Sequence, residues 1–200
     1  FNGTIRRDGS SRFSPSNRWG TFGSVGLGWV ASEEDFFKNN VKGIDYLKIR
    51  ASWGRLGNSN GVSPNLYQQG LSTGSTAIFG DNIYTAVQNA YLPDPNLRYE
   101  IVQGTDVGLE VRALNNRLSA DVNLYDKTTD GILTSFPLPA AEGGLTYFTN
   151  LGKISNKGIE VTLGWNDKIG SDFTYGISGN FSYNKNLVKS LGNTTEFQIT

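Results

Sequence analysis

The chain has 200 residues, and its 18 basic and 18 acidic residues give a formal net charge of zero. A neutral chain has no electrostatic attraction for nucleic acid or for an acidic substrate. Histidine, cysteine and methionine are absent, which excludes Ser-His-Asp and Cys-His nucleophiles, disulfides, zinc fingers and iron–sulfur clusters. We therefore expect no catalytic residue, no metal site and no cofactor. No run of about 18 apolar residues occurs, so no transmembrane helix is expected.

Period-two alternation of apolar and polar residues dominates the chain, and it is typical of β-strands with two different faces. A partial strand ends near Arg6. Six full segments follow in chain order: residues 19–30, 47–53, 100–112, 118–125, 159–165 and 173–184. Several runs reach ten or more residues, which is longer than the usual strand of a soluble sheet and suits a tilted membrane crossing. The sequence predicts an all-β chain with seven strands.

Charge is confined almost entirely to one face of these segments. In residues 100–112, for example, Ile101, Val107 and Leu109 share a face without charge, while Glu100 and Glu110 lie on the other. A soluble β-sandwich would show the same alternation with its apolar face turned inward. A barrel in a membrane would turn that face to lipid. The alternation alone leaves both folds open.

The spacing of aromatic residues favours the membrane. Trp19 and Trp29 lie ten residues apart on one face, about 33 Å along a strand and roughly 24 Å in height at a ~45° tilt. That height is close to the ~25 Å apolar band between the aromatic girdles of an outer-membrane barrel. Phe173 and Tyr183 repeat the spacing, and Trp165 lies on the same kind of face. We expect these five residues to form a membrane-interface girdle.

Loop lengths alternate along the chain, as expected for short periplasmic turns and long extracellular loops. Asn115-Asn116 predicts a tight hairpin, since asparagine tolerates the positive φ that such turns require. Residues 166–171 form a second short link, whereas 58–98 and 133–155 are expected to be long connections. The link 32–45 falls on the short side, although it is longer than a tight turn.

Seven strands do not close a barrel of even strand number, and an open edge in lipid would leave backbone groups unpaired at several kcal/mol each. A further β-like run begins at residues 196–199. The chain is therefore expected to be a seven-strand portion of a larger antiparallel transmembrane β-barrel.

Motifs along almost the whole chain resemble those of the SusC/RagA family of TonB-dependent outer-membrane transporters of Bacteroidetes. These motifs occupy residues 6–13, 22–29, 32–34, 47–54, 57–58, 95–100, 116–118, 125–130, 150–152 and 156–160. Their order and rough spacing agree with the family, which makes the resemblance more specific than one short motif.

The resemblance implies an outer-membrane barrel of 22 strands, with an N-terminal plug in the lumen through which TonB energises import. Residues 1–200 would be part of the barrel wall, without the plug or the C-terminal closing strand. The resemblance also implies a SusD-like surface lipoprotein as partner and a glycan or an oligopeptide as cargo, and it carries over no catalytic residue. The alternative function is a soluble or surface-attached β-sandwich that binds carbohydrate.

Three groups of residues are candidate sites. Glu100, Asp106 and Glu110 share a strand face, but their spacing places them ~13 Å or more apart, too far for the carboxylate pair of a glycosidase; Glu160 and pairs between neighbouring strands remain open. Glu33-Glu34-Asp35 lacks the ligand spacing of a calcium loop. Seven residues of the loop 58–98 suit contact with a sugar, a peptide or the lipoprotein lid: Tyr67, Gln68, Gln69, Phe79, Asp81, Asn82 and Tyr84.

Overall fold

The computed structural model describes residues 1–191, and the expected run at 196–199 lies outside them. The strands are β1 (Asn2–Gly9), β2 (Trp19–Val30), β3 (Ile44–Asn58), β4 (Leu71–Phe79), β5 (Asn82–Asn89), β6 (Glu100–Ala113), β7 (Leu118–Pro137), β8 (Thr146–Ile169) and β9 (Phe173–Ser190). Short helical segments are η1 (Ala31–Glu33), α1 (Asp35–Asn40) and η2 (Ala140–Glu142). Within the described part, no helix is long and apolar enough to cross a membrane.

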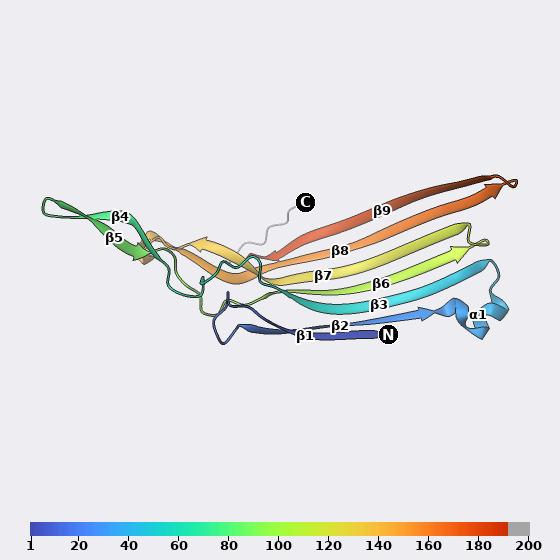
Figure 1. Cartoon of the computed structure of the whole chain (residues 1–200), viewed down its shortest axis with the longest axis horizontal. Coiled ribbons are helices and arrows are strands. Elements are labelled where there is room, and N and C mark those ends of the chain that lie inside the picture. The colour runs from blue at the N-terminus through green and yellow to red at the C-terminus, as the bar shows by residue number, and fades with distance from the viewer. Residues whose placement is uncertain (192–200) are drawn as a thin grey trace.

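Seven strands form one sheet in the order β1-β2-β3-β6-β7-β8-β9, and every neighbouring pair is antiparallel. The strands lie side by side along the length of the molecule, and β1 and β9 form the two edges (Figure 1). The remaining strands, β4 and β5, pair only with each other and project beyond one end of the sheet (Figure 1). This confirms the expected all-β, antiparallel wall with seven strands.

The end of the sheet opposite the β4–β5 hairpin carries the short links. Leu114, Asn115 and Asn116 each have φ of 60°, so the β6–β7 turn places left-handed backbone at both asparagines, as expected. Gly170 supplies φ of 66° in the β8–β9 turn. The link between β2 and β3 holds η1 and α1, which period-two reading did not predict.

Two loop expectations need correction. The connection expected at 133–155 is mostly strand, because β7 continues to Pro137 and β8 begins at Thr146. The pairing shifts register between Asp130 and Leu133. Such bulges interrupt the strict alternation of apolar and polar residues, so the sequence pattern did not predict strand there. Similarly, the connection 58–98 is not structureless, since it contains the β4–β5 hairpin.

A small hydrophobic core lies at the loop end of the sheet, and we call it the loop core. Its buried members come from β2 and from loop residues far apart in the sequence: Phe13, Phe22, Val62, Leu66, Leu97 and Tyr99. Phe13 and Leu97 are completely buried. Gly57 leaves room for the Phe22 ring, because a Cβ at that position would overlap it. The loop core fixes the loops 10–18 and 59–99 to the wall.

Candidate functional site

Part of one face of the sheet, across β2, β3 and β6 to β9, forms a continuous uncharged surface, which we call the apolar belt. Direct pairing places Leu27, Ala51, Val107, Leu124, Ile159 and Tyr183 in one row across six strands. Successive rows add Trp29, Ile49, Leu109, Val122, Val161 and Phe181, then Leu47, Val111, Ala120 and Leu163. The single-strand alternation seen in the sequence therefore adds up to one surface across the wall.

Many large side chains of the belt are exposed, and none of the belt residues named above is buried. The exposed fractions are 62% for Leu27, 70% for Ile177 and 63% for Phe181. No second sheet covers this surface among the described residues, because the other sheet is only the β4–β5 hairpin. A soluble protein rarely exposes an apolar patch of this extent, so the surface requires an apolar environment outside the chain.

The belt slants across the strands. Trp19 marks its loop end on β2 and Tyr183 marks the same end on β9. Tyr183 lies in the same row as Leu27, and this row crosses five strand-to-strand steps from β2 to β9. On β2, Leu27 is eight residues from Trp19, so the loop end of the belt shifts by eight residues over these five steps. Eight residues at ~3.3 Å over five steps at ~4.8 Å give a strand tilt of roughly 45–50°. Barrel strands tilt by about 35–45°, so the slant is close to that of a closed barrel in a flat layer.

The structure places the five expected girdle residues on this face. Trp19, Trp29, Phe173 and Tyr183 are 58%, 46%, 60% and 58% exposed, and Trp165 is half-buried beside Leu118 and Ile177. The indole Nε1 of Trp29 donates a hydrogen bond to Glu34 Oε1 at 2.9 Å. This bond holds the polar edge of the ring toward the η1–α1 link, away from the middle of the belt.

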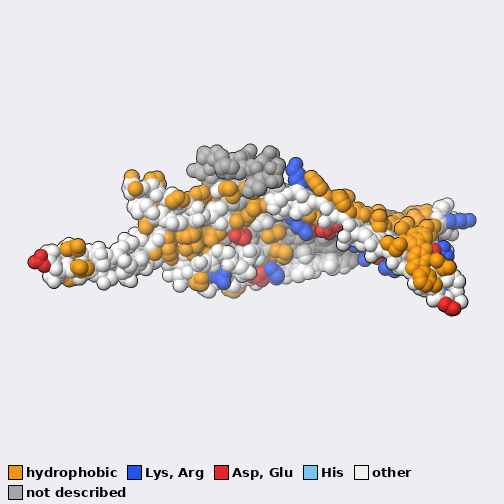
Figure 2. All heavy atoms as spheres, turned by 90° about the horizontal axis from the view of Figure 1, so that it is seen from above, with side chains coloured by type: hydrophobic (Ala, Val, Ile, Leu, Met, Phe, Trp, Pro, Cys, Tyr) orange, Lys and Arg blue, Asp and Glu red, His pale blue; other side chains and the backbone are white. Residues whose placement is uncertain are grey.

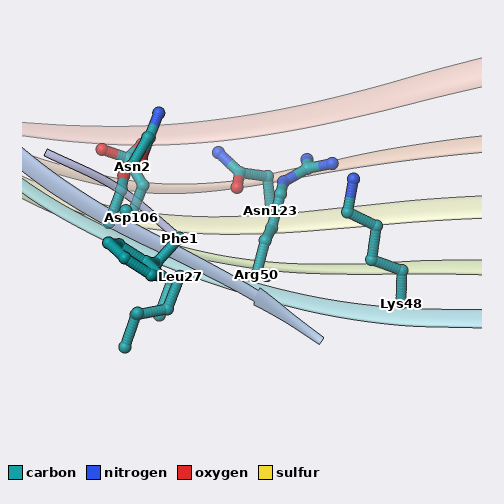
Figure 3. Close-up of a pocket in the computed structure, with 11 residues that line it drawn as sticks. Phe1, Asn2, Leu27, Lys48, Arg50, Asp106 and Asn123 are labelled. Carbon is teal, nitrogen blue, oxygen red and sulfur yellow. The ribbon is translucent and has the colours of Figure 1, made fainter. Parts of the chain in front are cut away.

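The opposite face is polar. Lys48, Arg50 and Asn123 point to one side of the sheet and Leu27 points to the other (Figure 3). Arg50 on β3 reaches across β6 and donates two hydrogen bonds to Asp121 on β7, at 3.1 and 3.0 Å. The guanidinium crosses directly over Gly108, where a Cβ would collide with it. A glycine in the middle strand thus permits an ion pair between strands that are not neighbours.

The candidate carboxylates on this polar face are dispersed. Glu100 accepts hydrogen bonds from Asn58 Nδ2 and from the backbone N–H of Leu133, each at 3.1 Å. Asp106 faces Lys127 at 3.8 Å, and Glu110 pairs with Arg112 at 3.3 Å. Each of these acids thus forms hydrogen bonds or an ion pair with a neighbouring strand, loop or cation.

Acid clusters elsewhere do not form a metal site in the described part of the chain, where no group of three or more possible ligands converges. In the η1–α1 link, Glu33 pairs with Lys38 at 2.9 Å and Glu34 binds the Trp29 indole. The hydrogen bond that Lys38 Nζ donates to Glu33 raises the pKa of Lys38. Glu33 and Glu34 therefore have local partners within the η1–α1 link.

The structure separates the seven expected loop residues into two groups. Tyr67, Gln68 and Gln69 lie at the base of the hairpin, where Gln68 Nε2 donates to Tyr67 Oη at 2.9 Å and Tyr67 packs against the loop core. Phe79, Asp81, Asn82 and Tyr84 lie at its tip. The nine residues of β4 separate the groups by about 30 Å. They form two surfaces, and their contact with a ligand stays a prediction.

The loop core contains the residues that sequence reading missed. Phe22 lies on the polar face of β2, among Gly20, Ser24 and Gly26, where a lone large aromatic was the available signal. Tyr99 packs on Phe13 and Phe22 with ring centroids 4.7 and 5.4 Å away, and its hydroxyl donates to the Arg18 carbonyl at 3.2 Å. Burial, with a smaller contribution from Asp8, raises the pKa of Tyr99.

Comparison with known proteins identifies this wall. A profile of the family described as TonB dependent receptor-like, beta-barrel matches residues 1–199. TonB-dependent receptor P39 of Formosa agariphila is 35% identical over 198 residues, which cover 98% of this chain and 18% of that protein. TonB-dependent receptor SusC of Bacteroides thetaiotaomicron is 33% identical over 206 residues, covering 100% of this chain and 20% of that protein.

Solved structures give the same result. The RagAB peptide importer in its closed-closed state superposes with a TM-score of 0.81 at 27% identity, covering 96% of this chain and 21% of that chain. Its open-open state gives 0.80 at 28% identity, covering 93% and 20%. This chain thus spans about a fifth of the length of the relatives that it matches. It belongs to the TonB dependent receptor-like, beta-barrel family and forms part of an outer-membrane barrel wall.

Proposed function

We propose that the apolar belt faces the lipid of the outer membrane and that the polar face lines the lumen of a TonB-dependent importer of glycans or oligopeptides. The slant of the belt carries the proposal, because it turns six tilted strands into one level apolar layer. Among the relatives, SusC is named a TonB-dependent receptor and RagAB is named a peptide importer. The girdle residues Trp19, Trp29, Trp165, Phe173 and Tyr183 then lie at the two membrane surfaces.

The rest of the transporter completes the proposal. A barrel of 22 strands encloses a lumen wide enough to require a plug. We assign the plug and the closing strand to parts of the protein outside residues 1–200. The charges on the described lumen face are mostly paired, as in Arg50–Asp121 and Lys127–Asp106. Paired charges create little net field, so this wall suits an uncharged or weakly charged cargo better than a polyanion.

The β4–β5 hairpin is the proposed contact for a SusD-like lipoprotein. Leu71, Ile78, Phe79, Ile83 and Val87 are all between 62% and 73% exposed. In the view of Figure 2, a small group of hydrophobic side chains lies near the tip of the projecting hairpin, and an acidic side chain marks the tip itself. An isolated two-stranded hairpin is marginally stable in water, and the exposed apolar groups of this one support the proposal that a partner covers it.

Other functional classes have weaker support. A carbohydrate-binding sandwich needs a second sheet against the apolar belt, and the only other sheet among residues 1–191 is the projecting hairpin. An enzyme needs converging reactive groups, whereas the described carboxylates on the lumen face are dispersed among structural partners. Transport is the function that uses both faces of the wall.

Uptake by whole cells tests this function. Cells that carry the complete transporter and its lipoprotein should accumulate fluorescent oligosaccharide or oligopeptide, and deletion of TonB should abolish accumulation while surface binding persists. Ile83→Asp and Phe79→Asp should reduce recovery of the lipoprotein with the tagged transporter, because a charge enters an apolar contact. Gln88→Glu near the hairpin base is the matched control. Accumulation that continues without TonB would contradict the proposal.

A further inference from the structure

The outer face of the wall changes chemistry abruptly at the loop edge of the apolar belt. Leu124, Ile159 and Tyr183 form the last apolar row on β7, β8 and β9. Two residues farther along the same face, the next row is Asp126, Lys157 and Lys185. The change occurs within about 7 Å along the strands. Beyond the loop edge of the belt, the outer face of the wall is charged.

A groove of about 450 Å³ opens in this charged zone. Its lining includes Arg55 on β3, Gln103 on β6, Asp126, Thr128 and Asp130 on β7, and Lys153 on β8. All six side chains belong to the outer face by alternation and pairing with the belt residues. Both neighbours of each of these four strands are present in the sheet, so no further strand of the barrel covers the groove.

The charges of the groove are only partly compensated. Lys153 faces Asp130 at 3.5 Å and Lys157 pairs with Asp126 at 2.6 Å, with side chains about half exposed. Neither Arg55 nor Lys185 has an ion-pair partner among the described residues. Arg55 is two residues from Trp53, which is in the Val25 row of the belt. An unpaired guanidinium beside lipid requires an anion or a polar headgroup.

We propose that this groove binds the phosphorylated sugar headgroup of an outer-leaflet glycolipid. Arg55 and Lys153 supply charge-assisted hydrogen bonds to the phosphate. Asp126, Asp130, Gln103 and Thr128 match the sugar, because carboxylate and amide oxygens accept hydrogen bonds from hydroxyl groups. A bare phosphate would be repelled by the two aspartates, so the mixture of charges selects a phosphorylated sugar. The acyl chains of the same lipid then cover the adjacent apolar belt.

The proposal rests on the assignment of the apolar belt to lipid, and a separate variant tests that assignment. If Ile177→Arg in the middle of the belt assembles as well as the unchanged protein, the belt does not face lipid and both proposals fail. If Ile177→Arg impairs assembly but the groove variants retain glycolipid, only the present proposal fails.

Native mass spectrometry of the complete transporter, purified in mild detergent and stripped of lipid, provides the experiment. Monophosphorylated lipid A, the same lipid without its phosphate, and inorganic phosphate are titrated in turn. We expect the phosphorylated lipid to bind best and Arg55→Ala/Lys153→Ala to weaken its binding by about tenfold or more, from two lost charge-assisted contacts. Lys168→Ala, an exposed cation at the other end of β8, should leave binding unchanged.

Each other outcome overturns the proposal: equal binding by the double variant, equal binding of the lipid without phosphate, saturation by inorganic phosphate alone, or an equal loss in Lys168→Ala. If the double variant fails to assemble, Arg55→Lys replaces it. Lysine keeps the charge but cannot make the bidentate hydrogen bonds of the guanidinium. Binding of the phosphorylated lipid should therefore weaken while assembly persists.

Discussion

The apolar belt and the loop core are both built from large hydrophobic side chains, yet they differ in almost every physical respect. Leu27 and Ile177 in the belt are 62% and 70% exposed, whereas Phe13 and Leu97 in the loop core are 0% exposed. The belt is periodic and comes from strands, while the loop core joins residues that are far apart in the sequence. The solvent explains the difference, because lipid solvates the belt and water drives the loop core together.

The largest expected effect is in the loop core. Phe13→Ala should cost about 3–5 kcal/mol in the opening of the loops, because it removes a fully buried ring and leaves a cavity. Hydrogen exchange and limited proteolysis of residues 59–99 in the complete transporter would measure the change. Phe79→Ala, at a position 70% exposed on the hairpin, should barely alter the same signals. Equal effects at the two positions would contradict the packing described for the loop core.

The next effect tests the solvent of the belt. Ile177→Arg or Val107→Arg should destabilise the complete barrel by about 2–4 kcal/mol in a bilayer, since both residues lie near the middle of the belt. Ser178→Arg is the matched control because its side chain lies on the opposite face, beside Gly164, and it should be tolerated. Folding into vesicles with urea titration distinguishes them. Similar damage at positions 177 and 178 would indicate a wall buried on both sides.

The smallest effect belongs to the lumen face. The Arg50–Asp121 pair has two good hydrogen bonds, but its side chains are 40% and 39% exposed. Water therefore screens the pair, and a double-mutant cycle with Arg50→Gln and Asp121→Asn should give a coupling of about 0.2–1 kcal/mol. A coupling of several kcal/mol would mean that the plug or another part of the protein excludes water from this face.

Sequence periodicity predicted the wall well because strands alternate with a fixed period and pairing preserves that period from strand to strand. It failed where the period breaks, at the bulges between Asp130 and Leu133. It also missed the hairpin and the loop core, because contacts such as Phe13 with Tyr99 depend on loop paths that no local pattern encodes.

The candidate site was predicted unevenly for related reasons. The five aromatic girdle positions follow from spacing along single strands, and the structure places all of them on the belt face. The loop residues from Tyr67 to Tyr84 were chosen for their chemistry, and the hairpin separates them into two surfaces. The outer groove was not expected, since Arg55, Asp130 and Lys153 meet only through pairing across four strands.

The length of β8 determines how far this part of the wall extends beyond the apolar belt. The strand has 24 residues, but the belt uses only its last part, from about Ile159 to Ile169. The remaining thirteen residues, tilted like the rest, rise about 30 Å above the lipid. With the belt in lipid as proposed, β8 therefore stands above the membrane by more than the thickness of one leaflet, whereas β2 begins at the edge of the belt with Trp19.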